Sequence, residues 1–425
     1  MPPQDFVFAH LADAHVGAWT RDPAVRGALR TSLLRALEVV EERGAEFLLI
    51  SGDLFHTPVP DPGEVAPVAA ALKRLIDHGR RIYLIYGSHD YVAHRTSWLD
   101  VLAETGVFLK VAPEAVRAEG TRWTLPFHVD APTGARIAGI SGRSHGLDRE
   151  YFRAVDAEAF RAEPGFRIFQ FHAAVDEYLP PSLREHIHGI RRGDLPGGLD
   201  YYAGGHIHYS YEGEGPDGGL LINPGAVFGT SRTDLENGLA GRTHQGVVIV
   251  RVQGGVPRAE FVDTAPKESL RLVDVDVTGK TAEEARAELR ERVEREATDG
   301  TLVFPRIHGE LADGSIASLA LGELSRSAGQ RAGSIHWDLR DLAPTAGRAE
   351  TSTEAEVEGR VISGLLTTSE LPAPWPAGEE GERNIRELLR ELGLPPSEGE
   401  SRQDYAHARL AGARRILGVR PESEA

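Results

Sequence analysis

The sequence predicts an α/β protein in which a parallel sheet packs on a second sheet, followed by a small α+β module and a helical end. Over about the first 90 residues, apolar runs alternate with helical patterns in a β-α-β-α-β order. This order favours parallel strands joined by right-handed crossovers. From about residue 107 to 252 the apolar runs become shorter and Gly/Pro turns separate them, which favours a second sheet packed on the first.

In the first part we expect strands over residues 6–12, 47–50 and 82–86. Apolar side chains at helical spacing predict helices over residues 25–43 and around residues 65–75. Each predicted strand is followed by a polar motif. In open α/β sheets, ligands bind at the carboxyl ends of the strands, so these motifs are expected to form one site.

The second part is expected to add strands over residues 135–140, 166–171, 220–222 and 246–250, all assigned to the second sheet. Residues 199–203 read as another strand. Together these elements predict a first domain of residues 1–265.

A boundary at Pro266 separates this domain from a predicted capping domain of residues 266–345. That module should contain a strand over residues 270–277, a helix opened by a capping box at Thr281, and a strand over residues 301–307. Residues 346–425 are expected to hold an acidic Pro-rich linker around residues 371–381, followed by two amphipathic helices.

Composition limits the chemistry. The 425 residues include no cysteine, which excludes disulfides, zinc-thiolate sites and thiol nucleophiles. A reducing cytoplasm fits this composition, and neither a secretory signal nor a membrane-spanning run is expected. The net charge of −17 argues against non-specific coating of DNA, although local arginines and bound cations can reverse the sign at one groove.

Two pairs of potential ligands have the same spacing, Asp13-x-His15 and His206-x-His208. In extended chain, residues at i and i+2 point to the same side, so each pair can reach one point. With Asp53 and His172 these residues make six oxygen and nitrogen donors, a mixture that suits Mn²⁺, Fe²⁺ or Zn²⁺.

Six ligands are too many for one tetrahedral ion with an open position, and they suit two ions that share a carboxylate. Such a pair promotes in-line displacement at phosphorus. His89, in the motif Gly87-Ser88-His89-Asp90, could protonate the leaving oxygen or stabilise the transition-state charge, with Asp90 orienting it.

The ordered set of motifs resembles the calcineurin-like metallophosphoesterase superfamily. Within it, the chain is similar to the SbcD/MRE-eleven family of DNA-repair nucleases. The narrower resemblance rests on residues 52–56 (Gly-Asp-Leu-Phe-His), residues 194–208 and the sequence Asn223-Pro224-Gly225-Ala226. It implies an αββα sandwich of two sheets, a capping domain after Pro266, and a C-terminal helical extension.

The resemblance also implies roles for single residues. The first ion would be held by Asp13, His15, Asp53 and His208. Asp53 would bridge to a second ion held by Ser88, His172 and His206. His89 would be the catalytic histidine, and His56 would steer the nucleic-acid strand toward the metals.

The same resemblance implies an Mn²⁺-dependent DNA exonuclease and endonuclease that acts in DNA repair and recombination. Its DNA substrates would be double-stranded ends, hairpins or single strands. The protein would be a homodimer bound to an SbcC-type ATPase, cytoplasmic and associated with the nucleoid, without a membrane partner.

One position departs from the family pattern, which has asparagine where this chain has Ser88. The serine side chain also offers an oxygen but is shorter. Its shorter reach leaves room for a water between it and the metal, so we expect the second ion to bind more weakly.

Two other functions stay open at this stage. The chain could be a phosphodiesterase for small nucleotides or phosphoesters, or a non-catalytic scaffold for an SbcC-type ATPase, with Ser88 as a sign of decay. The terminal helices could dock on their own catalytic domain or bind the coiled coil of the ATPase as helices in a groove.

Overall fold

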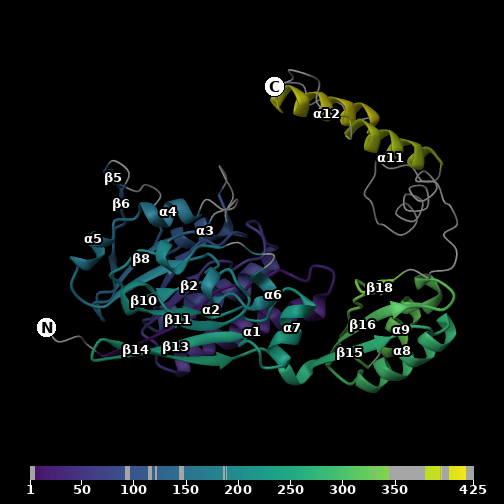
Figure 1. Ribbon diagram of the computed structural model, residues 1–425, viewed down its shortest axis with the longest axis horizontal. Coiled ribbons are helices and arrows are strands. Elements are labelled where there is room, and N and C mark those ends of the chain that lie inside the picture. Colours follow the sequence, from purple (N-terminus) through teal and green to yellow (C-terminus); the bar gives the residue numbers. More distant parts are fainter. Residues whose placement is uncertain are drawn as a thin grey trace. The chain divides into compact units, whose positions relative to one another are not determined.

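The computed structural model describes residues 5–90, 96–112, 117–119, 122–142, 148–184, 187, 189–329, 331–343, 379–392, 394 and 402–417. The chain forms two compact units, Met1–Pro344 and Thr345–Ala425, which are described separately (Figure 1).

Two six-stranded sheets build the first part of the larger unit. The first sheet has the order β14-β13-β1-β2-β3-β4 and the second has the order β11-β12-β10-β9-β8-β7. The strands of the first sheet are β1 (Phe6–Leu11), β2 (Phe47–Ser51), β3 (Arg81–Ile85), β4 (Leu109–Lys110), β13 (Gly246–Gln253) and β14 (Val256–Asp263). Those of the second are β7 (His128–Val129), β8 (Arg136–Ile140), β9 (Arg167–Phe171), β10 (Tyr201–Ala203), β11 (Tyr211–Glu214) and β12 (Leu220–Asn223).

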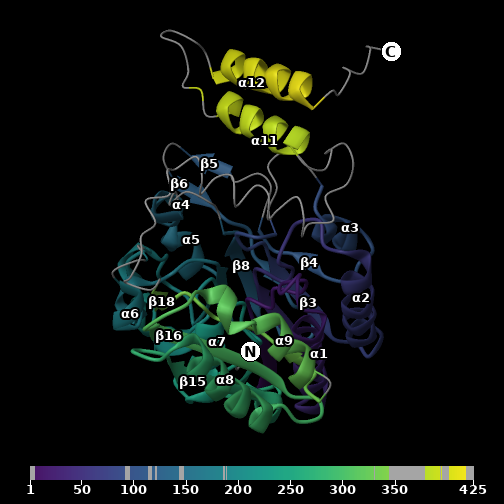
Figure 2. The same ribbon diagram turned by 90° about the vertical axis from the view of Figure 1, so that its right-hand side faces the viewer.

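Helices cover the outer face of each sheet. The first sheet is covered by α1 (Pro23–Glu42), α2 (Pro62–Asp77) and α3 (Trp98–Glu104), and the second by α4 (Asp148–Ala154) and α5 (Ala157–Arg161). Figure 2 shows α2 and α3 on one side of the paired sheets and α4 and α5 on the opposite side. The predicted αββα sandwich is therefore confirmed.

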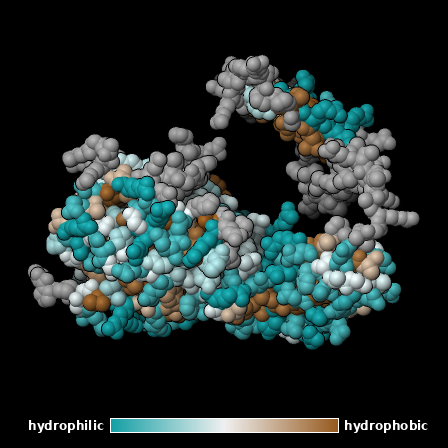
Figure 3. Space-filling view, viewed as in Figure 1, coloured by the Kyte–Doolittle hydropathy of each residue, from teal (hydrophilic) through white to brown (hydrophobic). Residues whose placement is uncertain are grey.

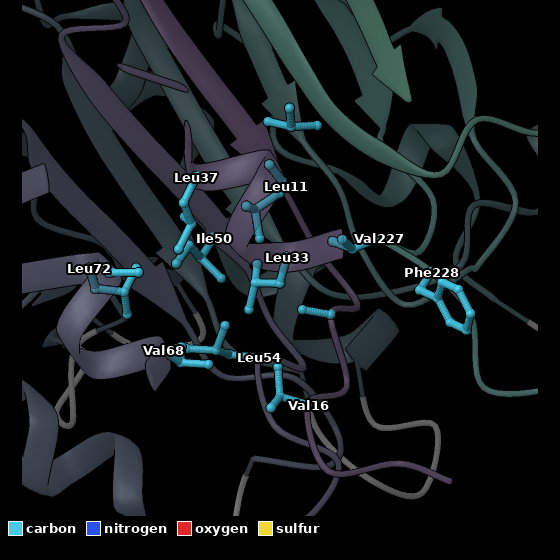
Figure 4. Close-up of a cluster of buried hydrophobic side chains, with 14 of the residues drawn as sticks. Leu11, Val16, Leu33, Leu37, Ile50, Leu54, Val68, Leu72, Val227 and Phe228 are labelled. Atoms are coloured by element: carbon cyan, nitrogen blue, oxygen red, sulfur yellow. The ribbon is translucent and has the colours of Figure 1, made fainter. Parts of the chain in front are cut away.

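The side-chain alternation of β1 explains this layering. Phe6 and Phe8 point between the sheets, where they pack with aromatic and branched side chains of both. Ala9 and Leu11 point to the other face, toward α1 and α2. Figure 4 shows Leu33 of α1 and Val68 of α2 in the same cluster. The period of two in a strand thus assigns one β1 face to each core.

The strands β1, β2 and β3 pair in parallel, as predicted. The assignment of residues 246–250 to the second sheet is wrong. β13 instead lies beside β1 in the first sheet, antiparallel to it, and continues into the hairpin partner β14. Residues 247–250 of β13 are all apolar and buried, as expected of a strand covered on both faces. Because such a strand has no alternation, periodicity alone could not assign it to one of the two sheets.

The remaining elements of the larger unit include a separate cluster of strands and helices after residue 266, here called the cap (residues 270–343). It contains β15 (Leu270–Asp276), α8 (Ala282–Glu296), β16 (Leu302–Glu310), α9 (Leu321–Ala328), β17 (Ser334–Ile335) and β18 (Leu342–Ala343). Thr281 caps α8 through the predicted capping box, and the cap has its own hydrophobic cluster around Val275, Leu289 and Ile307. The domain boundary at residue 265 stays a prediction.

Other short elements of this unit are β5 (Arg117–Glu119), β6 (Arg122–Thr124), α6 (Pro181–Arg184) and α7 (Arg232–Leu239). The smaller unit contains α11 (Glu379–Leu392) and α12 (Arg402–Ile416), the two helices expected there. Residues 371–378 of the predicted linker lie outside the described residues, and α11 already includes Glu379–Gly381. Among the described residues, no helix combines the length and apolar character that a membrane crossing requires.

Candidate metal centre

The predicted ligands follow the carboxyl ends of five strands. Asp13 and His15 follow β1, Asp53 follows β2 and Ser88 follows β3. His172 follows β9, and His206 and His208 follow β10. Because the two sheets are packed with these ends together, segments almost 200 residues apart meet in one place, as the hydrogen bond from the His206 amide to Asp13 shows at 2.9 Å.

The Asp53 carboxylate lies between two groups of histidines. Its Oδ2 atom is 3.6 Å from His15 Nε2 and 3.2 Å from His172 Nε2. The Oδ1 atom accepts a hydrogen bond of 2.8 Å from the backbone amide of His89. One oxygen of Asp53 therefore faces both sides of the site, as a bridging ligand would.

The first group of donors consists of Asp13, His15 and His208, whose ligand atoms lie within 4.8 Å of one another. The Nε2 atoms of His15 and His208 are 3.1 Å apart. Two nitrogen ligands about 2.1 Å from one ion and at a right angle to each other would be about 3 Å apart. This spacing fits two ligands of a common metal ion.

The second group of donors includes Asp13, Asp53 and His172, also within 4.8 Å. The rings of His172 and His206 are 5.1 Å apart. His172 donates from Nδ1 to the carbonyl of Ser51 at 2.8 Å, and its buried Nε2 lies 3.2 Å from Asp53 Oδ2 without the geometry of a hydrogen bond. A buried nitrogen of this kind is a ready position for a cation, so the donor set fits a divalent metal.

The backbone around the site is strained. Asp13, His15, Asp53 and His206 have positive φ angles of 52°, 45°, 53° and 90°. Non-glycine residues rarely adopt this region, and such residues cluster at functional sites. Each left-handed residue turns the chain sharply after a strand and so aims its side chain back across the strand ends.

Two glycines make room for the ligands. A Cβ atom on Gly52, which has a φ of 91°, would lie 2.4 Å from His172 Nδ1. A Cβ on Gly87 would lie 2.1 Å from Asp53 Oδ1. Any larger side chain at these positions would push a ligand out of place.

The electrostatics of the site call for positive charge. Burial opposes protonation of His172, but the adjacent Asp53 carboxylate outweighs it and raises the pKa of His172 to about 10. Burial also lowers the pKa of His208, but the Asp234 carboxylate and other nearby carboxylates together outweigh burial and raise that pKa to about 9. Although burial favours the neutral acid, His172 and His15 hold the pKa of Asp53 below its usual range. Without a cation, therefore, protons on histidines balance the carboxylates.

The residues expected to act beside the metals also lie here. Ser88 Oγ is 3.4 Å from Asp53 Oδ2. The exposed ring of His89 stacks on that of His56 at a centroid distance of 5.0 Å, and a His56 nitrogen lies 3.4 Å from one of His15. Their ring nitrogens form a cluster with His15.

The role expected for Asp90 differs from the observed one. Its buried carboxylate accepts the backbone amides of Asp53 at 2.6 Å, Gly87 at 3.0 Å and Phe55 at 3.3 Å. The His89 ring is instead held by the carbonyl of His56, 3.0 Å from Nδ1. Asp90 thus joins the loops after β2 and β3, because three amides converge on it, and does not orient His89.

Asp234 is a functional residue that the sequence reasoning missed. Its Oδ2 atom is 3.0 Å from His208 Nδ1, and it also accepts the amides of Thr230 and Ser231. A carboxylate behind a metal-ligating histidine fixes the ring and its tautomer. The sequence shows Asp234 only as part of the capping box Ser231-x-x-Asp234, which predicts the start of α7 and not the contact with His208.

Comparisons with known proteins agree with this geometry. The sequence profile of the calcineurin-like phosphoesterase family matches residues 6–210, the part that carries all these ligands. Residues 6–210 are therefore similar to a calcineurin-like phosphoesterase domain, as the motifs predicted.

The chain is also similar to archaeal proteins named DNA double-strand break repair protein Mre11. It is 26% identical to that of Methanopyrus kandleri over 300 residues, which are 68% of this chain and 62% of the relative. It is 25% identical to that of Archaeoglobus fulgidus over 321 residues, 70% of this chain and 67% of the relative. The matched region thus spans less than two thirds of the Methanopyrus protein.

A first prediction concerns Ser88. The substitution Ser88→Asn should raise the affinity for the second Mn²⁺ by about tenfold, a change typical of one group at the edge of a metal site. Calorimetric titration with Mn²⁺ measures it. The matched control is Ser315→Asn, since Ser315 is an exposed residue that precedes the short helix Ile316–Leu319, within residues 270–343. Unchanged affinity in Ser88→Asn would contradict the interpretation of position 88.

A second prediction concerns pH. Since His172 and His208 hold protons up to a pKa of about 10 and about 9, metal binding at pH 7 must displace these protons. The apparent Mn²⁺ affinity should fall as pH is lowered, by on the order of tenfold per pH unit for each displaced proton. Calorimetry in buffers with different ionisation enthalpies counts the released protons, and a count of zero would contradict the assignment.

Proposed function

We propose that this protein is a two-metal, Mn²⁺-dependent DNA nuclease that hydrolyses phosphodiester bonds at DNA ends. The observation that carries the proposal is the position of Asp53 Oδ2, 3.6 Å from His15 Nε2 and 3.2 Å from His172 Nε2. The similarity to Mre11 repair proteins supports DNA as the substrate.

We assign the first ion to Asp13, His15, Asp53 and His208, and the second to Asp53, Ser88, His172 and His206. The donors are oxygen and nitrogen atoms without thiolate, which suits Mn²⁺. Two bound divalent ions would activate water and neutralise the oxygens of the phosphate.

The protein's own part in the reaction centres on His89. Because a carbonyl oxygen can only accept, the His89 nitrogen facing the His56 carbonyl carries a hydrogen. The other ring nitrogen, Nε2, is then available to exchange a proton with the leaving oxygen or to contact the phosphate. Burial and the neighbouring His89 lower the pKa of His56, which favours its neutral form. A neutral His56 would contact the nucleic-acid strand near the metals without repelling the cations.

The third prediction tests this role. His89→Gln should reduce Mn²⁺-dependent cleavage of a labelled duplex on the order of 10²- to 10⁴-fold, the usual contribution of a positioned acid or base. Mn²⁺ binding should stay unchanged, because His89 is not a proposed ligand. His78→Gln is the control, since His78 is half exposed at the carboxyl end of α2 and pairs with Glu41.

The same assay separates the alternatives. Activity on bis(p-nitrophenyl) phosphate without any cleavage of duplex ends or hairpins would show a small-molecule phosphodiesterase. Absence of bound Mn²⁺ would favour a scaffold without catalysis. The assay is run with and without an SbcC-type ATPase.

The helices α11 and α12 support the proposed ATPase partner. They pack on each other, with Arg409 paired to Glu391 at 3.0 Å and Tyr405 donating to the carbonyl of Leu394. Yet Leu389, Leu392 and Leu410 stay 51%, 49% and 49% exposed. Figure 3 shows hydrophobic side chains on the surface of this helical pair. An exposed apolar stripe on a helix suits a helix-in-groove contact with a coiled coil. The homodimer is proposed from the resemblance alone.

The fourth prediction follows from this assignment. Truncation before Glu379, which removes both helices, should abolish association with the ATPase and leave Mn²⁺-dependent cleavage intact. Co-purification and the duplex assay measure the two effects. Retained association would contradict the partner assignment, and loss of folding would show that the helices dock on their own chain.

A further inference from the structure

The helix α7 contacts both the metal centre and the cap. At one side Asp234 holds His208, a proposed ligand of the first ion, at 3.0 Å. Two residues earlier and two residues later, Arg232 and Glu236 bind residues of the cap. A helix is a rigid connection over such a short distance, so displacement at one contact is transmitted to the other.

Arg232 depends on the cap for its partners. Its side chain is almost fully buried, and its Nε atom donates to Glu236 at 2.8 Å. The two terminal nitrogens donate to the cap, one to the Phe304 carbonyl and the other to Asp274 at 3.2 Å. A buried guanidinium without partners is strongly unfavourable, so α7 is stable in this position only with the cap against it.

Glu236 adds a second contact between α7 and the cap. Its carboxylate accepts from Arg306 of β16 at 2.5 Å. Arg306 also lies 3.8 Å from Asp338, another residue of the cap. Arginines and carboxylates thus alternate across the junction, which restricts rotation of α7 as well as its distance from the cap.

The loop that follows His15 contacts the same face of the cap. The Trp19 ring packs against Phe304 and His336 at centroid distances of 5.9 and 5.1 Å. Trp19 also donates from its ring nitrogen to the Gly229 carbonyl at 3.1 Å, just before α7. Asp22 accepts a hydrogen bond from Ser334 of β17. Both histidines of the first group therefore sit on segments that the cap supports.

The proposed ligands of the second ion are held differently. His172 is fixed by the Ser51 carbonyl at 2.8 Å, and the Asp53 amide by the Asp90 carboxylate at 2.6 Å. These partners belong to β2 and to the loop after β3, both in the first sheet. The two ions would consequently have unequal support, one from the sheets alone and one from the sheets and the cap.

We propose that the cap, through Arg232 and Trp19, positions His15 and His208, so that cap contact and affinity for the first ion are coupled. Arg232 and Trp19 are positioning residues in this scheme, since neither touches the ions. The inference rests on the two-ion site of the proposed function and adds that one ion responds to the state of the cap.

The test measures Mn²⁺ binding to the full chain by calorimetry. Arg232→Gln and the milder Asp274→Asn should each weaken one of the two binding events, Arg232→Gln by about fivefold or more, a typical size for coupled sites. The other event should keep its wild-type affinity. Trp19→Phe, which keeps an aromatic ring against Phe304 and His336 but loses the indole N–H bonded to Gly229, should have the smaller effect on the same event. Arg286→Gln, within the cap and paired with Glu323, is the control.

Reciprocity gives a second measurement on the wild-type chain. If metal affinity depends on the cap, metal binding must strengthen the cap contact by the same free energy. Mn²⁺ should then slow amide hydrogen exchange in α7 and at the β16 face near Phe304. If Arg232→Gln does not fold, this measurement tests the coupling: unchanged exchange rates in α7 and β16 on Mn²⁺ binding would overturn it.

The failures can be told apart. A wild-type chain that binds no Mn²⁺ would overturn the proposed function itself. Two Mn²⁺ ions bound with wild-type affinities in folded Arg232→Gln and Asp274→Asn would overturn the coupling alone. Equal weakening of both ions would also overturn it, because a general loss of stability has no preference between them.

Discussion

The organisation of this protein depends on one electrostatic constraint: several carboxylates are buried close together, and positive charge must balance them. Asp13 and Asp53 lie at the strand ends, and Asp234 lies behind His208. Burial raises the pKa of Asp13 to about 6, while the raised pKa values of His172 and His208 show protons held by the same field. Divalent cations would replace those protons with stronger charge, and the oxygen and nitrogen donors of the site are the ones that hard and borderline metals prefer.

The fold makes this arrangement possible by bringing the carboxyl ends of strands from two sheets together. The cost is local strain at four ligand or near-ligand residues with positive φ, on the order of 1–3 kcal/mol each. Large apolar cores on both faces of the first sheet and on the second sheet stabilise the frame against that cost. Asp90 contributes in another way, since its carboxylate ties the loops after β2 and β3 through three amides. Backbone contacts thus hold the loops, while Ser51 and Asp234 orient the rings of His172 and His208.

Much of this was accessible from the sequence because it is local. Strand ends and the capping box at Thr281 are read within a few residues, and the structure places them as expected. The extended chain predicted for the i,i+2 pairs is wrong, because Asp13, His15 and His206 have positive φ angles. His206 lies beside His172, whereas His208 lies with Asp13 and His15. The position of β13 was not accessible, since an apolar run shows that a strand is buried and does not show beside which strand it lies. Asp234 and the contacts of Asp90 were missed for a related reason. Their partners are decided by how α7 and the loops pack, which no spacing in the sequence encodes.

The proposed bridging by Asp53 is tested most directly by electron paramagnetic resonance of the protein loaded with two equivalents of Mn²⁺. Two ions that share the Asp53 carboxylate should give the spectrum of a spin-coupled pair, and Asp53→Asn should remove the coupling. A spectrum of isolated, uncoupled Mn²⁺ at full loading of the wild-type protein would contradict the account.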